Sequence, residues 1–182
     1  MPRLEGVRIR LRDFAAGDRE PLLALASDEA MFTYMKFRID RESAESVLLP
    51  RLLQEPHLDP RTSYNLVLED TGGFCGWAGI DRIQGTDSGQ VGWYLRSDRW
   101  GRGYATEATG LLLEFGFEVL DRTMLWATAD PDNLASRRVL EKSGLTRLEQ
   151  TSPVQTWRGT RPRLLFTIDG ESWRRQVRRP EP

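Results

Sequence analysis

A short stretch in the middle of the chain, RSDRWGRGYATEA at residues 96–108, combines glycines, arginines and small residues in a pattern that could bind phosphate. It follows an apolar strand-like run and opens a helix-like run. The first N–H groups of a helix lack intrahelical partners, and the helix dipole adds partial positive charge at that end. Gly101 and Gly103 would let a ligand approach the backbone closely, and three arginines add local positive charge. The stretch therefore predicts a diphosphate site, with a plain turn as the alternative.

Three kinds of phosphate loop can be compared with this stretch. A P-loop ends in Gly-Lys-Ser/Thr, and the chain contains no such ending here. A dinucleotide-binding loop needs G-x-G-x-x-G, whereas the run from Gly101 ends in Thr106 and lies beyond the middle of the chain. Too few strands follow it for two nucleotide-binding halves. The remaining kind is a coenzyme A loop.

Hydrophobic periodicity predicts the elements that must position this loop. Strands are expected at 7–14, 63–83 as a hairpin, 90–96, 123–130 and 156–168, and helices at 18–30, after Asp40, at 104–120 and at 133–145. The hairpin turns at residues 70–73, and the strand after it completes an antiparallel meander. Pro50 should kink or split the helix that follows Asp40. The pattern indicates an α/β fold whose antiparallel sheet is crossed once by the helix at 104–120.

Bulk composition limits the classes of function. We expect one domain over residues 1–182, with a C-terminal tail from about 174, because 182 residues suit a single core. No apolar run could span a bilayer and no secretory signal is present, so we expect no membrane partner and a cytoplasmic location. A net charge of -1 gives no global field for nucleic acid. One histidine, His57, and one cysteine, Cys75, predict no metal site and a buried, unreactive thiol.

Two motifs together carry a family resemblance. The chain from WYLRSDRWGRGYATEA to NLASRRVLEKSGL resembles the GNAT acyltransferases, and specifically their ribosomal-protein N-acetyltransferase-like branch. The resemblance covers nearly the whole chain. It implies the GNAT fold: a mixed, mostly antiparallel sheet of six to seven strands with a splayed central pair, and about four helices. Trp100 stands where the general superfamily pattern has Arg or Gln, a departure shared by this branch.

The resemblance implies acetyl-CoA as co-substrate and assigns residues to it. The pyrophosphate is expected on the backbone N–H groups around residues 101–106, and the pantetheine arm between the strand ending near Leu95 and the strand at 124–129. The residues expected to contact the coenzyme are Trp93, Leu95, Gly101, Arg102, Gly103, Tyr104, Ala105, Thr106, Asn133, Ser136 and Arg137.

Acyl transfer from a thioester to an amine needs a neutral amine, a donor for the oxyanion and a proton for the leaving thiolate. By family analogy a backbone N–H near Trp93 or Tyr94 holds the oxyanion. We expect Ser136 to protonate the thiolate, since its i, i+3 spacing from Asn133 places both side chains on one helix face. Alternatively, Asn133 is a helix cap and Ser136 a first-turn residue with no ligand.

The base that deprotonates the amine is not defined by a motif. The branch often has a glutamate where this chain has Gln90, which cannot take a proton. Asp81, Tyr94 and a water chain to bulk solvent are the candidates. Glu107 needs no catalytic role, because a carboxylate in the first turn of a helix is explained by the helix dipole.

The sequence therefore predicts an N-acetyltransferase that moves an acetyl group from acetyl-CoA to a primary amine by direct attack in a ternary complex. The acceptor is a protein N-terminus or a small-molecule amine. Its binding wall is expected in residues 28–62 and 150–161, and a homodimer is possible. The alternatives are a catalytically idle CoA-binding module and a protein-interaction domain without coenzyme.

Overall fold

The fold is described here from a computed structural model of residues 2–177, in which the side chains of residues 150–152 are not described. The strands are β1 (Arg3–Glu5), β2 (Arg10–Asp13), β3 (Ser63–Asp70), β4 (Gly73–Arg82), β5 (Ser88–Leu95), β6 (Met124–Ala129), β7 (Thr146–Thr156) and β8 (Gly159–Asp169). The α-helices are α1 (Arg19–Ala26), α2 (Arg41–Ser43), α3 (Leu49–Gln54), α4 (Tyr104–Glu114), α5 (Leu134–Lys142) and α6 (Gly170–Val177).

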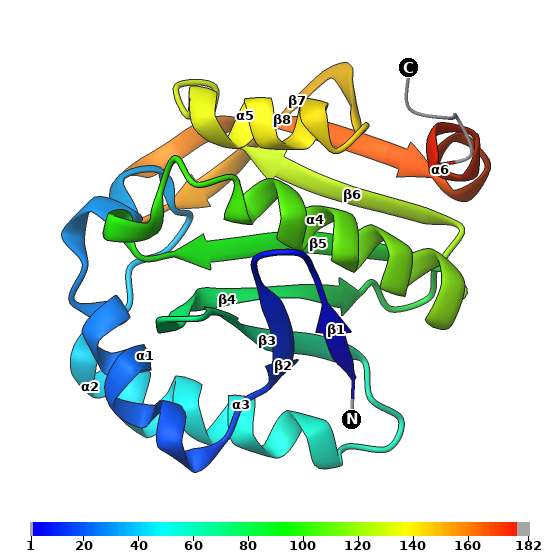
Figure 1. The fold of residues 1–182 in the computed structure, drawn as a ribbon. Helices are drawn as coiled ribbons and strands as arrows, with labels where there is room; N and C mark the ends of the chain where they lie inside the picture. The colour runs from blue at the N-terminus through cyan, green and yellow to red at the C-terminus, as the bar shows by residue number, and fades with distance from the viewer. Residues whose placement is uncertain (1, 178–182) are drawn as a thin grey trace.

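All eight strands form one sheet in the order β1-β2-β3-β4-β5-β6-β8-β7. Every neighbouring pair is antiparallel except β5 and β6, which are parallel and are connected through α4. A parallel pair needs a long crossover, and α4 supplies it across one face of the sheet (Figure 1). The expected meander and the single crossover helix are both confirmed.

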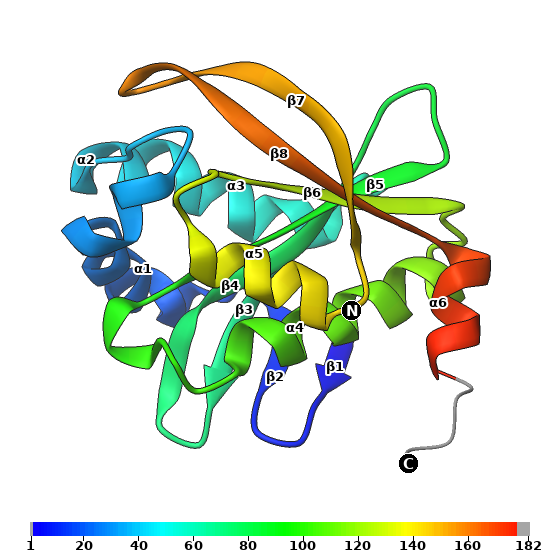
Figure 2. The same cartoon turned by 90° about the horizontal axis from the view of Figure 1, so that it is seen from above.

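Two hydrophobic cores lie on opposite faces of the sheet. One contains Leu112 of α4 and Leu140 of α5 packed on the strands, and Trp173 of α6 joins it through Phe117, with ring centroids 5.3 Å apart. The other packs Leu22 of α1 and Leu52 of α3 against the opposite face. Figure 2 shows α4 and α5 on one side of the strands and α1 to α3 on the other. The sheet therefore separates a face covered by α4 and α5 from a face covered by α1 to α3.

The structure corrects three expectations. The sheet has eight strands rather than six to seven, because the first residues add β1 as a short edge strand on β2. The helices number six rather than about four, since α2 and α6 are additional. Helix α6 extends to Val177, so the predicted tail from 174 begins as helix, because Trp173 anchors that segment in the core. The rest of the tail, 178–182, lies outside the described residues.

The helical segment that follows Asp40 is irregular next to Pro50. The backbone stays helical from Arg41 to Gln54, with a wide π turn at Ala44–Leu48 immediately before α3. Pro50 falls within the first two residues of α3, where a missing N–H is tolerated. The helical segment after Asp40 is therefore divided by the π turn into α2 and α3, and the division lies directly before Pro50.

Candidate active site

Strands β5 and β6 separate in the middle of the sheet. Their pairing is limited to three residue pairs, the last of which joins Gln90 to Trp126. Beyond that pair the strands diverge, and residues 91–95 of β5 have no partner on the β6 side. The expected splayed pair is therefore present, and it opens toward the carboxyl ends of both strands (Figure 1).

The hydrogen bonds of β5 show which of its groups face the gap. The N–H of Arg96 donates to Cys75 O at 2.9 Å, and Ser88 O accepts from Ile83 N at 3.3 Å, so the even-numbered residues bond toward β4. Backbone groups alternate in direction along a strand, so the N–H of Trp93 points into the gap and that of Tyr94 does not. Of the two expected oxyanion donors, the geometry favours Trp93.

The loop before α4 contains a run of unused backbone donors. None of the N–H groups of residues 101–106 donates a hydrogen bond within the described part of the chain. Gly101 and Gly103 have left-handed φ values of 74° and 77°, and Gly103 is the N-cap of α4 with no side-chain cap. These conformations and the helix dipole together suit an anion, so we call residues 101–106 the phosphate cradle. The cradle lies at the same end of β5 as the gap (Figure 1).

Two of the three arginines around the cradle are already paired with carboxylates. Arg96 donates to both oxygens of Asp98 at 3.0 and 3.1 Å, and Arg99 Nη1 lies 2.9 Å from Asp70 Oδ2. Arg102 makes only a 3.3 Å contact from Nη2 to the carbonyl of Asp98. Of the three, Arg102 is therefore the cation with charge still available to a phosphate.

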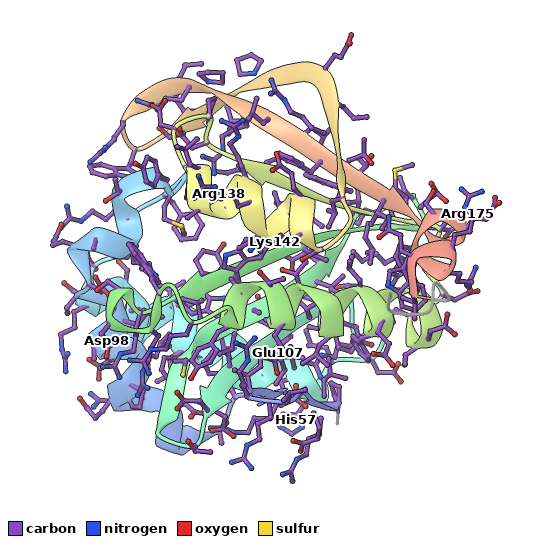
Figure 3. All side chains as sticks on the ribbon, turned by 45° about the horizontal axis from the view of Figure 1, so that its top comes forward. His57, Asp98, Glu107, Arg138, Lys142 and Arg175 are labelled. Carbon is purple, nitrogen blue, oxygen red and sulfur yellow. The ribbon has the colours of Figure 1, made fainter. Side chains whose placement is uncertain are left out.

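Arg8, which lies just before β2, contacts the phosphate cradle, and the sequence motifs did not assign it to the site. Its Nη1 donates to the carbonyl of Arg102 at 2.7 Å, and its Nε donates to Glu107 at 2.8 Å. Glu107 also accepts from the N–H groups of Arg8 and Ile9 at 2.8 and 3.3 Å. Figure 3 places Asp98 in the loop before α4 and Glu107 on the helix itself. Glu107 thus joins the β1–β2 hairpin to the cradle and has a structural role, as expected.

Asp70 fixes the other side of the loop. Its carboxylate accepts from Arg99, from the Tyr104 hydroxyl at 2.9 Å and from Gly72 N at 2.7 Å. Burial acts to raise the pKa of Asp70, but the hydrogen bonds from Tyr104 and Gly72 and the charge of Arg99 lower it below its ordinary value. The side chain therefore stays ionised and ties the β3–β4 turn to the first residue of α4.

The start of α5 shows the capping that was weighed against a coenzyme role. Asn133 is the N-cap, and its side chain accepts from Ser136 N at 3.0 Å. The hydroxyl of Ser136 makes no hydrogen bond within residues 2–177 and is available to a ligand. Arg137 donates to the carbonyl of Pro131 at 3.1 Å, which holds it against its own loop. Capping accounts for Asn133, while Ser136 keeps a free polar group.

Tyr94, Asp81 and Gln90 lie on the face covered by α1 to α3. Tyr94 stacks on Trp77 with ring centroids 4.2 Å apart, and burial together with the nearby charge of Asp81 raises its pKa to about 12. Its phenol is therefore protonated near neutral pH and can donate a proton but not accept one. Asp81 is exposed at the end of β4, directly opposite Gln90 in the β4–β5 register. A carboxylate thus stands beside the position where the branch often has one.

The two segments that were predicted to form an acceptor wall contact each other in the structure. The N–H of Trp157, at the tip of the β7–β8 hairpin, donates to Lys36 O at 3.1 Å. Arg163 of β8 donates from Nη1 to Tyr34 O at 2.9 Å. These bonds close the hairpin over the segment that follows α1. Of the aromatic wall residues, Phe32 is buried in the core, whereas Tyr34 and Phe37 are exposed.

Cys75 is fully buried, and burial raises the pKa of its thiol to about 11, so it is not a nucleophile at neutral pH. Within residues 2–177 no cluster of His, Cys, Asp and Glu could hold a metal ion. None of the helices in that range is both long and apolar enough to traverse a bilayer.

Comparison with known proteins assigns the chain to a family. Residues 8–146 match the family model described as an acetyltransferase (GNAT) domain. The chain belongs to the GNAT acetyltransferases. Among curated GNAT relatives, the uncharacterized N-acetyltransferase p20 of Bacillus licheniformis is 26% identical over 149 residues, which cover 77% of this chain and 83% of p20. YnaD of Bacillus subtilis is 24% identical over 140 residues, covering 77% and 80% of the two chains. This GNAT protein is therefore an acyltransferase.

Solved structures share the GNAT fold. Mycobacterium smegmatis RimJ in complex with CoA-disulfide superposes with a TM-score of 0.83 at 21% identity, covering 97% of this chain and 93% of RimJ. A ribosomal-protein-S5-alanine acetyltransferase from Vibrio fischeri has a TM-score of 0.78 at 16% identity, with 95% and 99% of the two chains covered. Identities of this size establish the common fold.

Proposed function

We propose that this GNAT protein transfers an acetyl group from acetyl-CoA to a primary amine by direct attack in a ternary complex. The observation that carries the proposal is the run of unused N–H donors at residues 101–106, next to the gap between β5 and β6. Bound acetyl-CoA would supply the acetyl group as a thioester. The complex of RimJ with CoA-disulfide shows that a protein of this fold accommodates coenzyme A.

The cradle fits a diphosphate in both charge and shape. Successive N–H groups that follow left-handed glycines converge on one point and stabilise phosphate oxygens there. Arg102 adds an available cation, and Arg8 holds the Arg102 carbonyl by a hydrogen bond. The N–H of Trp93 in the gap is the proposed oxyanion donor. Coenzyme and reacting carbonyl would thus be held mainly by backbone groups.

Asp81 is the proposed base. An amine with a pKa near 10.4 is mostly protonated at neutral pH, so a carboxylate must take a proton before the nitrogen can attack. Directly paired residues on antiparallel strands carry side chains about 5 Å apart, so the Asp81 carboxylate can take a proton from an amine bound next to Gln90. The amine nitrogen then bonds to the acetyl carbon as the carbon–sulfur bond breaks. Asp81 holds the first proton, and the second proton of the nitrogen passes to solvent, which balances the proton that the thiolate gains.

Two hydroxyl groups could protonate the departing thiolate, and we propose Ser136 for this step. Ser136 lies in the first turn of α5, where the helix dipole favours an anion, and its hydroxyl has no partner in the described structure. Tyr94 is held in its protonated form on the opposite face, where an acceptor would approach. Tyr94 is therefore the proposed hydrogen-bond donor on the acceptor side.

Calorimetric titration with acetyl-CoA, followed by turnover on a panel of amines, tests the proposal. Thr106 occupies the first turn of α4, where a glutamate is favourable for the helix but would repel phosphate. We expect Thr106→Glu to abolish binding and the uncharged Thr106→Gln to bind as well as the native protein does. Absence of binding by the native protein would refute the cradle. Binding without turnover on any amine would instead favour the idle module.

A further inference from the structure

The wall on the acceptor side contains a buried arginine whose surroundings the transfer mechanism does not explain. Arg163 is 7% exposed and lies on β8 next to Leu164, which pairs with Ala129 at the end of β6. Leu164 faces the core beneath α4 and α5, so alternation turns Arg163 to the face of α1 to α3. Its guanidinium therefore lies on that face, next to Tyr34 and next to Asp130, which follows the end of β6.

Of the three nitrogens of this guanidinium, only Nη1 has a partner within residues 2–177. Nη1 donates to Tyr34 O at 2.9 Å and lies 3.6 Å from Asp130 Oδ2. Nε is buried with no partner, and Nη2 makes no hydrogen bond within residues 2–177. Nε and Nη2 form the edge of an arginine that binds a carboxylate through two parallel hydrogen bonds. The Nε–Nη2 edge of Arg163, which is suited to a carboxylate, is therefore without a partner in the described structure.

Lys36 supplies a second cation with no partner. Its amine makes no ion pair or hydrogen bond within the described residues, although the side chain is half-buried. Burial and the nearby charge of Arg163 both lower the pKa of Lys36. Two like charges therefore approach each other in a partly desolvated place, which is unfavourable unless an anion joins them.

The neighbouring carboxylates supply that anion only in part. Asp130 Oδ2 is shared between Arg163 and Arg161, whose Nε lies 3.3 Å away, and Asp130 Oδ1 accepts from the N–H of Asp132. Asp132 pairs with Arg161 at 3.0 Å. Asp81, on the same face, acts on Tyr94, whose hydroxyl also senses the charge of Arg163. The wall thus has an excess of positive charge close to the reacting face.

We infer that the amine acceptor carries a carboxylate, which is bound by the free Nε–Nη2 edge of Arg163 and by Lys36. The inference rests on the proposed function and narrows its acceptor class to amino-acid-like amines. Such an acceptor would place its carboxylate on the wall and its amine toward Asp81 and the gap. A polyamine would be repelled by the same two cations.

Product binding tests the inference without requiring turnover. Calorimetry on the protein loaded with CoA compares N-acetylglycine with N-acetylglycinamide, and then the matching acid and amide pairs of the other amino acids. Since a charge-assisted fork contributes about tenfold or more in affinity, the best acid should bind at least about tenfold tighter than its amide. Lys36→Met and Arg163→Lys should each remove most of that preference without changing the affinity for the amide.

A matched control uses Arg158→Met, which removes an exposed cation of the same wall that lies over the Trp157 ring. This variant should retain the preference for the acid. Equal affinity for acid and amide in every pair, or a preference that survives both Lys36→Met and Arg163→Lys, overturns the inference. CoA binding is measured first in the same experiment. Its absence would refute the proposed function itself, whereas intact CoA binding without acid preference would refute only the carboxylate site.

Discussion

At the scale of single residues, the opposition of Asp81 and Gln90 across β4 and β5 makes the base assignment testable by moving one carboxylate. Asp81→Asn should lower kcat by about a hundredfold or more while the affinity for acetyl-CoA stays unchanged, because only proton transfer is lost. Adding Gln90→Glu to that variant should restore much of the rate. Steady-state measurement of released CoA thiol follows both. Full activity of Asp81→Asn would show that solvent or another group takes the proton.

Tyr94 makes a prediction about alkaline pH. Its folded-state pKa of about 12 lies above the value of about 10 for a tyrosine in an unfolded chain. The folded state therefore holds a proton that the unfolded state loses, and its stabilising effect is complete below about pH 10 and disappears as the pH rises toward 12. Tyr94→Phe should reduce the alkaline fall in unfolding free energy. Denaturant titrations at several pH values measure it, and identical profiles for both proteins would contradict the assigned burial of the phenol.

Substitutions of Ser136 and Asn133 should have different effects, one on the rate of transfer and the other on stability. Ser136→Ala keeps the backbone N–H that donates to the Asn133 side chain, so α5 should remain capped and stable. The rate of transfer should fall by about tenfold or more with little change in the affinity for acetyl-CoA, since one proton donor is removed. Asn133→Ala, in contrast, should cost about 1 kcal/mol of stability as a lost cap. An unchanged rate in Ser136→Ala would leave the serine a purely structural residue.

At the scale of elements, Glu107 fastens the β1–β2 hairpin to the first turn of α4. Burial acts to raise its pKa, but hydrogen bonds from Arg8 and Ile9 lower it below the ordinary value. The stabilisation is therefore present above the unfolded-state pKa of about 4 and is lost as the pH falls through the lower folded-state value. Glu107→Gln should cost about 1 to 3 kcal/mol at neutral pH and flatten the acid limb of the stability curve.

Glu114→Gln is the matched control for Glu107→Gln, because Glu114 is exposed on the same helix and has no ion pair within residues 2–177. Glu114→Gln should leave both stability and its pH dependence nearly unchanged. Hydrogen exchange of the N–H groups of Arg8 and Ile9 offers a second readout, since both donate to Glu107. If both substitutions lowered the stability equally, the β1–β2 hairpin would be held by packing rather than by the hydrogen bonds to Glu107.

At the scale of the whole molecule, local patterns predicted what local physics determines. The glycines at 101 and 103 marked the loop before α4, where the structure has left-handed φ values, and the alternation of apolar residues predicted the meander. The contacts between Arg8 and Glu107, 99 positions apart, could not be seen in any window of sequence. Arg163 likewise resembled one more strand arginine until the β7–β8 hairpin placed it on Tyr34, 129 positions away. Contacts between residues far apart in the sequence, which composition does not reveal, determine which arginines are left without a carboxylate partner.

The two cores share one sheet, so we expect residues on both faces to unfold in a single cooperative transition that coenzyme binding shifts as a unit. Acetyl-CoA at about a hundred times its Kd should stabilise the folded state by about 2.7 kcal/mol. For a chain of this size that corresponds to a rise in Tm of roughly 5 to 10 °C. Thermal unfolding monitored by tryptophan fluorescence should show the rise in Thr106→Gln and not in Thr106→Glu. A rise of equal size in both variants would place the coenzyme away from the phosphate cradle, because only the glutamate adds negative charge to the first turn of α4.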